Sequence, residues 1–244
     1  KYLFYSLGEQ PFLFSITSRE KGFFSGATLL GEMAAELGLR TTWQASEGVP
    51  LEPGKCVFQA TGTASQIARA EEMLLGVIGK PSGVATAAAC FAKAADDRIK
   101  VVCGAWKKIA PKIRTELRQA IVTGGVGTRI TDQPFIYLDK NYVRLLGGVG
   151  PAIERARAYD TRRLVVVQLR GETQPIADEA ITALESGAAI LMVDTGKPED
   201  LATTAGLVAK SSRRKEVQLA FAGGVAAADL EMLIFLGADI VDVG

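Results

Sequence analysis

Runs of apolar residues alternate with amphipathic helices through the last third of the chain, and each run ends at a polar residue or a glycine. Apolar runs of about four to eight residues separated by helices are typical of βαβ units around a parallel sheet. Parallel strands are covered on both faces, so such runs are apolar throughout rather than alternating. The runs lie at residues 164–169, 189–193, 217–221 and 239–243.

The ends of these runs predict where a ligand would bind. When βαβ units close into a barrel, the ligand lies at the carboxyl ends of the strands. We therefore expect the functional site at this edge of the sheet. The residues at those positions are Gln168, Asp194, Gly223, Gly224 and Gly244.

The N-terminal part of the chain lacks this regular alternation and is typical of an α/β sandwich. Glycine and proline clusters separate its elements and mark the turns between them. The expected strands are residues 12–18, 41–45 and 56–60, and the expected helices are residues 25–36, 64–79 and 83–95.

The alternation begins near residue 99, with further strands expected at 99–103, 120–123 and 135–138. The number of strands is short for a closed barrel, which has eight. The predicted fold class is α/β. It consists of an N-terminal α/β sandwich over residues 1–98 and a C-terminal α/β barrel over residues 99–244, which is incomplete in this chain.

The composition excludes several classes of function. The net charge of +1 provides no broad attraction to nucleic acid or to an anionic membrane. The chain has no histidine, which excludes histidine-based triads, histidine zinc sites and an imidazole proton shuttle. Cys56, Cys90 and Cys103 show neither close pairing nor metal-ligand spacing, which indicates thiols in a reducing compartment. With no evident leader peptide and no run of about 18 apolar residues, we expect a cytoplasmic protein without a membrane span.

Two strand ends indicate groups that could hold a ligand. Gly223 and Gly224 follow a buried strand and precede a helix, which is the arrangement that binds phosphate through free backbone amides. An ordinary tight turn is the alternative, and Gly244 at the next strand end favours the phosphate site. Asp194 could ligate a cation, accept a hydrogen bond from a ligand hydroxyl, or cap the helix that begins near Pro198.

Basic residues follow two earlier segments. Trp106, Lys107 and Lys108 come after a strand and Gly104, where lysines at a helix N-terminus make sense if an anion is held there. The alternative is a solvated basic face that continues through Lys112, Arg114 and Arg118. Residues 123–129 form a glycine-rich loop that ends at Arg129, and this loop could equally be a plain connection.

These motifs, in this order, resemble the quinolinate phosphoribosyltransferase family (nicotinate-nucleotide diphosphorylase, carboxylating). The resemblance covers almost the whole chain, and its most specific pieces are residues 82–86 and the ordered strand ends. The motifs are Ala70–Glu72, Ser82–Thr86, Lys107, Gly124–Arg129, Asn141, Asp194, Gly223–Gly224 and Val243–Gly244.

The resemblance implies a fold, a reaction and a partner. The family has an N-terminal α/β sandwich and a C-terminal α/β barrel, and its subunits pair head-to-tail so that each active site is shared. Its members transfer phosphoribose from phosphoribosyl pyrophosphate to the ring nitrogen of quinolinate, with Mg²⁺, and release the 2-carboxylate as CO₂. A homodimer or higher homo-oligomer that binds small-molecule substrates, neither nucleic acid nor membrane, is therefore expected.

The resemblance also implies roles for individual residues. Lys107 and Arg129 match basic residues that hold the anionic substrates, and Asp194 matches the acidic residue that faces the ribose and the metal. Gly223, Gly224 and Gly244 match the cradle for the 5-phosphate. Lys107 and Asp194 are the expected catalytic residues, with Asp194 also the expected Mg²⁺ ligand. The remaining expected substrate-binding residues are Trp106, Arg129, Lys140, Gln168 and Glu72.

The chain departs from the family pattern mainly where the acceptor ring would bind. Quinolinate is a dianion, and desolvating two carboxylates requires charged donors such as paired arginines. The site as aligned should therefore bind quinolinate poorly, although Trp106 could stack on a flat, less charged ring. The departures are Trp106 and Glu72 in place of arginines, Thr128 in place of histidine, Asp139 in place of a lysine that Lys140 could replace, Gln168 in place of glutamate, and Ala222 in place of serine.

Three hypotheses follow. The first is a phosphoribosyltransferase acting on quinolinate, nicotinate or another planar ring in NAD biosynthesis. The second is a catalytically divergent relative that binds a phosphorylated ligand or a partner without quinolinate turnover, because a fold does not fix a function. The third is a different barrel enzyme that acts on a sugar phosphate.

Overall fold

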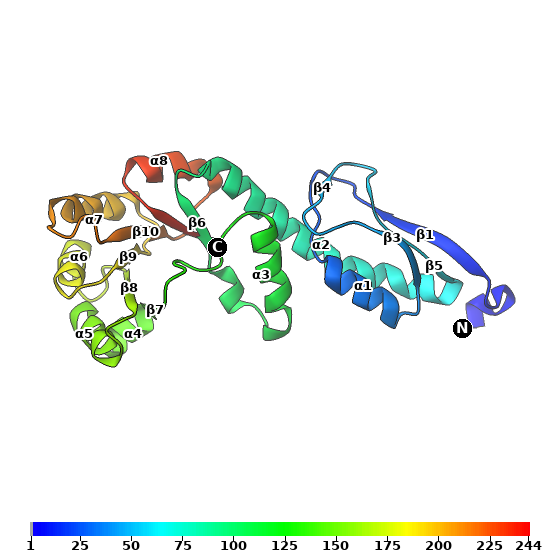
Figure 1. The fold of residues 1–244 in the computed structure, drawn as a ribbon, viewed down its shortest axis with the longest axis horizontal. Helices are drawn as coiled ribbons and strands as arrows, with labels where there is room; N and C mark the ends of the chain where they lie inside the picture. Colours follow the sequence, from blue (N-terminus) through cyan, green and yellow to red (C-terminus); the bar gives the residue numbers. More distant parts are fainter. Residues whose placement is uncertain (1) are drawn as a thin grey trace. The chain divides into compact units, whose positions relative to one another are not determined.

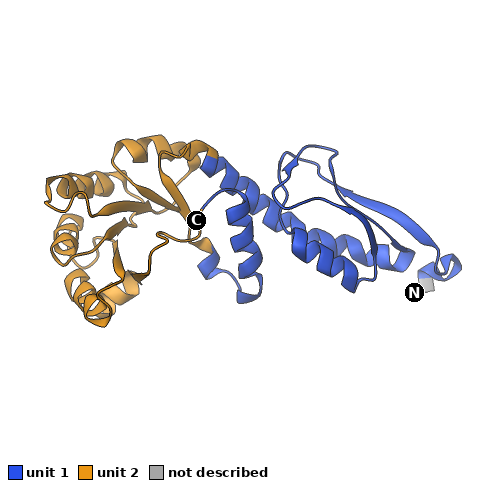
Figure 2. Cartoon of the chain, viewed as in Figure 1, with its two compact units in different colours: residues 1–92, 106–126 blue, residues 93–105, 127–244 orange. Residues whose placement is uncertain are grey.

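The computed structural model describes residues 2–244, and only the backbone of Tyr2. The chain divides into two compact units (Figure 2). Unit 1 comprises Lys1–Ala92 and Trp106–Val126, and unit 2 comprises Lys93–Ala105 and Gly127–Gly244. The domain boundary expected between residues 98 and 99 stays a prediction, because these units describe compactness and each consists of two pieces of chain.

Unit 1 contains a three-stranded antiparallel sheet in the order β1-β5-β3 (Figure 1). These strands are β1 (Pro11–Thr17), β3 (Arg40–Gln44) and β5 (Cys56–Thr63). The strands β2 (Gly22–Phe23) and β4 (Pro50–Leu51) form a separate antiparallel pair. The helices and 3₁₀ turns of this part of the chain are η1 (Tyr2–Leu7), α1 (Ala27–Glu36), α2 (Ala64–Ala95), η2 (Ala105–Lys108), η3 (Pro111–Ile113) and α3 (Arg114–Thr123).

The core of unit 1 lies between the antiparallel sheet and two helices. Leu30 from α1, Phe58 from β5 and Leu74 from α2 are all fully buried in one apolar cluster. The Phe14 ring packs against the Phe58 ring at a centroid distance of 6.0 Å. Burial of such side chains is the main force that stabilises a fold of this kind. The expected α/β sandwich is confirmed.

Helix α2 continues through Pro81, although the sequence predicted two helices that end near residue 79 and restart near residue 83. That prediction was wrong. Proline removes one backbone donor and usually breaks a helix, leaving the carbonyl four residues earlier without its partner. Here that carbonyl, Val77 O, faces the backbone of Gly26, where an added Cβ atom would lie only 2.7 Å from it. The segment before α1 therefore packs against the helix at the turn that precedes the proline.

Hydroxyl groups on α2 hold that segment in place. The Ser82 hydroxyl accepts a hydrogen bond from Ser25 N at 3.0 Å, and the Thr86 hydroxyl accepts one from Phe23 N at 2.9 Å. Thr86 Oγ1 also donates to Ser82 O at 2.7 Å. Residues 82–86, one of the most specific pieces of the family resemblance, therefore have a structural role. They join α2 to the segment before α1.

Glu47 ties the start of α1 to the end of α3. Its Oε2 accepts hydrogen bonds from Gly26 N at 2.9 Å and Ala27 N at 3.0 Å, and its Oε1 accepts one from Thr123 Oγ1 at 2.9 Å. Burial raises the pKa of Glu47, but the donors around it, including the nearby Ser25 hydroxyl, outweigh burial and hold the pKa below its ordinary value. The carboxylate form is thus the form that stabilises unit 1.

Replacing Glu47 with glutamine is expected to lower the free energy of unfolding by about 1–2 kcal/mol near neutral pH. A folded-state pKa below the unfolded one gives stability that is present above the unfolded pKa and is lost as the pH falls through the folded pKa. Urea titrations from pH 7 to pH 3 should show a smaller acid-induced loss in Glu47→Gln than in the parent protein. Glu32→Gln, at an exposed glutamate of α1, is the control. Equal acid-induced losses in parent and Glu47→Gln would contradict the assignment.

The end of α3 corrects a second expectation. Residues 120–123 were predicted as a strand, but they form the last turn of α3. Their β-branched character favours a strand locally. The buried side chains Leu117, Ala120 and Ile121 instead follow the helical spacing of three and four residues. The longer helical pattern outweighs the short apolar run.

Unit 2 contains a six-stranded, wholly parallel sheet in the order β6-β11-β10-β9-β8-β7. Helices α4 to α7 lie outside the curled row of strands in Figure 1. The strands are β6 (Lys100–Cys103), β7 (Phe135–Leu138), β8 (Leu164–Leu169), β9 (Ile190–Val193), β10 (Gln218–Ala222) and β11 (Ile240–Val243). The helices are α4 (Lys140–Leu145), α5 (Val149–Tyr159), α6 (Ile176–Glu185), α7 (Pro198–Lys210), the 3₁₀ turn η4 (Ala227–Asp229) and α8 (Leu230–Phe235).

The two faces of this sheet bury different clusters. Val165, Val167 and Leu169 of β8 pack with side chains of α5 and α6, while Val166 and Met192 belong to a cluster on the opposite, inner face. Successive side chains of a strand point to opposite faces. The strands β6 and β7 are the two edges of the sheet and do not pair with each other. The expected α/β barrel that is incomplete in this chain is confirmed.

Candidate active site

The inner face of the sheet ends in polar side chains at its carboxyl edge. Because alternate residues share a face, Gln168 lies on the same face as Val166, and Asp194 on the same face as Met192. Tyr137 belongs to this inner cluster too. Asp242, at the end of β11, accepts a hydrogen bond from Gly104 N at 2.8 Å.

Tyr137 lies among carboxylates at this edge. Burial, and then the charges of Asp242, Asp194 and Asp139, raise the pKa of Tyr137 far above its usual range, so the phenol stays neutral. The sequence patterns singled out neither Tyr137 nor Asp242. Both lie inside strands rather than after them, and the period of two along β7 and β11 was the signal that could have found them.

Asp194 and Gln168 are brought together at the ends of β9 and β8. Gln168 Nε2 donates a hydrogen bond to Asp194 Oδ2, and Gln168 Oε1 accepts one from Lys140 N at 2.6 Å. The side chain of Arg170 adds an ion pair, with Nη1 at 2.9 Å from the same Asp194 Oδ2. Asp194 does not cap α7, whose N-cap residue is Lys197. This arrangement excludes one of the three roles that the sequence allowed for Asp194.

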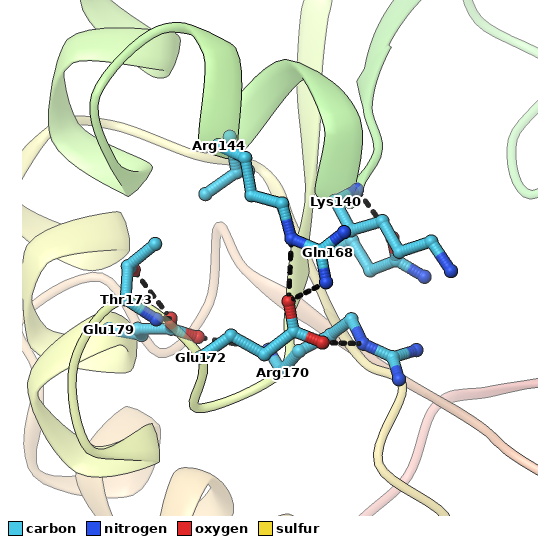
Figure 3. A pocket seen from close by; sticks show the side chains of 8 residues that line it. Lys140, Arg144, Gln168, Arg170, Glu172, Thr173 and Glu179 are labelled. Carbon is cyan, nitrogen blue, oxygen red and sulfur yellow. Dashed lines mark hydrogen bonds and ion pairs between the residues drawn. The ribbon is translucent and has the colours of Figure 1, made fainter.

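A chain of charges continues from Arg170 (Figure 3). Its Nε donates to Glu172 Oε1 at 2.9 Å, and Glu172 Oε2 accepts a hydrogen bond from Arg144 Nε at 2.9 Å. Hydrogen bonds from Arg170 and then Arg144 lower the pKa of Glu172. These residues line a small, open pocket together with Lys140, Gln168 and Thr173. The pocket is thus built mostly from side chains that can form charge-assisted hydrogen bonds.

The loop that carries Arg170 and Glu172 is held by a buried carboxylate. Glu179, on the first turn of α6, is only 2% exposed. Its Oε2 accepts hydrogen bonds from Arg170 N and Gly171 N, both at 2.9 Å, and its Oε1 accepts from Thr173 N and Thr173 Oγ1 at 3.1 and 2.7 Å. A buried carboxylate needs donors of this kind to offset its lost hydration. Glu179 therefore fixes the backbone from which Arg170 extends.

Lys140 begins α4 directly after Asp139, which caps that helix. Asp139 Oδ1 accepts hydrogen bonds from Asn141 N at 2.8 Å and Tyr142 N at 3.2 Å. Aspartate is among the preferred residues at such a position. The amine of Lys140 has no partner among the residues that the structure describes. Lys140 therefore offers an uncommitted positive charge at the pocket, whereas Asp139 has a structural role.

Gly223 and Gly224 form a tight loop after β10 with positive φ values of 118° and 76°. The helix expected after them is present, and it begins with the 3₁₀ turn η4 at Ala227 before α8 starts at Leu230. Ala226 N is taken by Asp229 Oδ2 at 2.8 Å, which organises the turn instead. The amides of Gly224 and Val225 donate no hydrogen bond within residues 2–244. Backbone amides of the loop, rather than a helix N-terminus, are the groups available to an anion.

The glycine loop packs against the segment that follows Asp194. Gly196 N donates to Ala222 O at 3.1 Å, and the backbones of Gly196 and Gly223 lie so close that a side chain at either would overlap the other. Gly244 follows β11, the neighbour of β10 in the sheet, and has open space around its Cα atom. Asp194, Gly223 and Gly244 are therefore brought to neighbouring strand ends.

Arg129 lies in unit 2, apart from the hydrogen-bond chain of Asp194. Its guanidinium stacks over the Phe135 ring at 5.4 Å, and its Nε donates to Thr131 O at 3.4 Å. Contact with an aromatic ring orients such a side chain without neutralising its charge. The charge of Arg129 thus remains available to an anionic ligand.

Trp106, Lys107 and Glu72 belong to unit 1. The guanidinium of Arg118 lies 4.5 Å from the Trp106 ring centroid and the Lys107 amine lies 6.0 Å from it. Trp106 Nε1 is buried without a hydrogen-bond partner in the part of the chain that the structure describes. Lys107 is part of the short turn η2 rather than the start of a helix, and Glu72 is exposed on α2.

Metal-binding groups do not gather in the described residues. Within residues 2–244, no three of the side chains Cys, Asp and Glu lie close enough together to hold a metal ion. Asp194 is a single carboxylate, and its Oδ2 is already occupied by Gln168 and Arg170. Any Mg²⁺ at this site would therefore need most of its ligands from water or from a substrate.

Family models match both parts of the chain. The C-terminal domain of quinolinate phosphoribosyl transferase matches residues 84–244, and the N-terminal domain of the same enzyme matches residues 3–82. The chain belongs to the quinolinate phosphoribosyl transferase family. This family consists of phosphoribosyltransferases, so the resemblance found in the sequence is confirmed.

Relatives of this family align along most of the chain. A probable nicotinate-nucleotide pyrophosphorylase (carboxylating) of Methanothermobacter thermautotrophicus is 27% identical over 236 residues, which cover 94% of this chain and 81% of the relative. The nicotinate-nucleotide pyrophosphorylase (carboxylating) of Homo sapiens is 26% identical over 241 residues, covering 97% and 78%.

Solved structures share the fold of this family member. The nicotinate-nucleotide pyrophosphorylase of Francisella tularensis has a TM-score of 0.82 at 22% identity, covering 100% of this chain and 84% of that one. The enzyme of Ehrlichia chaffeensis has a TM-score of 0.84 at 15% identity, covering 100% and 86%. At such identities the likeness shows the fold alone.

By length and hydropathy alone, helix α2 could cross a membrane. One such helix is weak support for a membrane span, because a core helix has the same composition. The Francisella tularensis structure covers the whole of this chain, α2 included. Side chains of α2 such as Leu74 and Ile78 also lie in the core of unit 1. The helix is therefore part of the family fold.

Proposed function

We propose that this protein is a phosphoribosyltransferase that joins phosphoribosyl pyrophosphate to the ring nitrogen of a pyridine carboxylate, quinolinate or a related ring, in NAD biosynthesis. The observation that carries the proposal is the match of both family domains along residues 3–244. The named relatives, carboxylating nicotinate-nucleotide pyrophosphorylases, support the same reaction.

The phosphoribosyl end of the site is assigned to the strand ends of β9, β10 and β11. Gly223, Gly224 and Gly244 would hold the 5-phosphate, since amides of this loop are open to an anion. Asp194 would face the ribose with its Oδ1, which accepts no hydrogen bond within residues 2–244. As pyrophosphate leaves, positive charge grows at the ribose C1, and a fixed carboxylate nearby stabilises it.

The anionic groups of the substrates are assigned to basic residues. Lys107 and Arg129 would hold them, as the family pattern implies, and Lys140 adds an uncommitted amine. Holding the two reactants in the geometry of the transfer provides a large part of the rate acceleration. The transfer itself needs no proton shuttle. A chain without histidine can therefore carry it out.

Residues from both units are candidates for binding the acceptor ring. Gln168 and Lys140 lie at the pocket beside Asp194 and are the acceptor-binding candidates of unit 2. Trp106 could stack on the ring only with the face that Arg118 does not occupy. Glu72 is exposed on α2 and would meet an acceptor at a subunit interface. The family pattern supports a homodimer or higher homo-oligomer with shared sites. The three cysteines without close pairing support a reducing compartment such as the cytoplasm.

The residues fit a Mg²⁺ ion that arrives with the substrate. Mg²⁺ usually keeps several waters and binds one or two carboxylates together with substrate phosphates. Asp194 would supply the protein ligand through Oδ1 and the pyrophosphate would supply others. When bound, the ion would neutralise negative charge on the pyrophosphate.

The test is calorimetric titration with phosphoribosyl pyrophosphate and Mg²⁺, followed by assays with quinolinate and with nicotinate. We expect binding of phosphoribosyl pyrophosphate and product formation that depends on it. Product with nicotinate but not quinolinate would show that the loss of arginines changed the acceptor. No binding of phosphoribosyl pyrophosphate would overturn the proposal and favour a divergent relative or an enzyme of simple sugar phosphates.

A further inference from the structure

The two oxygens of the Asp194 carboxylate have different surroundings. Oδ2 accepts from Gln168 Nε2 and lies 2.9 Å from Arg170 Nη1. Oδ1 accepts no hydrogen bond from the residues that the structure describes. A carboxylate held by one oxygen in this way cannot rotate freely, and its other oxygen keeps one direction.

Arg170 is itself held by two acidic residues besides Asp194. Glu172 Oε1 accepts a hydrogen bond from Arg170 Nε at 2.9 Å, and Glu172 Oε2 accepts one from Arg144 Nε. Glu179 Oε2 accepts a hydrogen bond from the backbone amide of Arg170 at 2.9 Å. An arginine loses much side-chain entropy when it is ordered, and here this loss occurs on folding rather than on substrate binding. The guanidinium is therefore in place before any ligand arrives.

The pair also sets the local charge. Phosphoribosyl pyrophosphate is strongly anionic, and an isolated carboxylate would repel it. Arg170 offsets the charge of Asp194 on the side away from the open oxygen, while Oδ1 stays an acceptor. The side chain of Asp194 is 22% exposed and that of Arg170 is 32% exposed. This partial exposure leaves room for a ligand beside them.

We infer that Arg170 is a positioning residue that orients Asp194 so that Oδ1 meets the ribose of phosphoribosyl pyrophosphate. The inference rests on the proposed function. The Arg144–Glu172 pair keeps Arg170 in place, and Gln168 shares the task from β8. The family pattern assigned no role to residue 170, which lies in a loop of this chain.

The first test is a kinetic comparison of Arg170→Gln and Arg170→Lys with the parent protein. Misplacing a reacting group by about 1 Å can reduce a rate about 100-fold, and we expect a fall in kcat of that order for Arg170→Gln. The KM for phosphoribosyl pyrophosphate should rise by no more than about threefold, from the loss of the charge that offsets Asp194, so that most of the effect falls on kcat. Arg170→Lys keeps the charge and should recover part of kcat. Arg155→Gln, at an exposed arginine of α5, is the control.

A rise in the KM of either substrate with an unchanged kcat would overturn the inference, because Arg170 would then bind that substrate directly. The second test adds Arg170→Gln to Asp194→Asn. If Arg170 acts through Asp194, the double variant should have nearly the kcat of Asp194→Asn, within about threefold. Independent effects that multiply would overturn the inference.

A third measurement does not require activity. The urea midpoints of the two single variants and the double variant should be non-additive, since the two side chains are in contact. Additive midpoints would overturn the inference even in an inactive protein. An inactive parent with non-additive midpoints would overturn the proposed function while leaving the contact between Arg170 and Asp194 supported. The two failures can thus be told apart.

Discussion

Asp194→Asn is expected to lower kcat/KM of the phosphoribosyl transfer by about 10²–10³-fold, the loss typical when a fixed electrostatic group is removed from a transition state. The asparagine has nearly the same shape but no charge to set against the growing positive charge at the ribose C1. It also removes the ion pair between Asp194 and Arg170 and leaves Arg170 paired with Glu172 alone. Both effects act on the transition state more than on the bound substrate.

Steady-state kinetics with phosphoribosyl pyrophosphate and the accepted ring would measure this loss. Glu199→Gln is the matched control, because it removes one exposed carboxylate from the first turn of α7, five residues further along the chain. The control should keep kcat/KM within about twofold, as substitutions at exposed sites usually do. If Asp194→Asn retained a similar activity, Asp194 would not be the residue that faces the ribose.

Gly223→Ala is expected to lower the free energy of unfolding by about 3 kcal/mol or more, because backbone strain and overlap act together. At φ 118° an L-residue with a side chain is strained. In addition, a Cβ atom at residue 223 would lie 2.5 Å from Gly196 N and 2.6 Å from Gly196 Cα, and a backbone cannot move aside as a flexible side chain can. Either the loop or the segment after Asp194 must shift.

The neighbouring glycine is the control for this variant. Gly224 also has a positive φ, 76°, but a Cβ atom there would meet nothing within 4 Å. Gly224→Ala should therefore cost only the conformational strain, about 1 kcal/mol. Urea unfolding of both variants gives the comparison. Equal losses would show that the contact between Gly223 and Gly196 has no part in the effect.

Much of the fold of unit 2 could be read from the sequence because its strands are buried on both faces. Apolar runs with polar or glycine ends predicted β8, β9, β10 and β11 within a residue or two. The same pattern placed Gln168, Asp194 and the diglycine at one edge, where parallel strands must bring their carboxyl ends together. Local composition was sufficient there, since each strand meets the same kind of surroundings.

Two predicted elements were wrong because their structure depends on residues that are distant in the sequence or on a longer helical pattern. Pro81 indicates a helix break, yet α2 continues through it, and Gly26 of the segment before α1 packs against the helix there. Residues 120–123 have strand propensity, yet they complete α3 because Leu117, Ala120 and Ile121 share one buried face. Tertiary packing commonly outweighs local propensity in this way.

The charged residues beside Asp194 were missed for a related reason. Arg144 lies on α4, and Arg170 and Glu172 lie in a loop, so no strand-end pattern singles them out. They meet because Glu179 shapes the loop and Glu172 bridges the two arginines. Such contacts depend on backbone geometry that residue order does not reveal.

The sequence by itself determined the class of fold and the family, and it placed the candidate site at the carboxyl edge of the sheet. These follow from hydrophobic period and from the order of motifs, which survive at low identity. Only the tertiary structure decided that the Lys140 amine has no partner among residues 2–244, and that Asp194 is held through one oxygen by Gln168 and Arg170. The physical reason is that a side chain's hydrogen-bond partners are set by which segments meet in space, and here those segments are separated by about one βα unit of sequence or more.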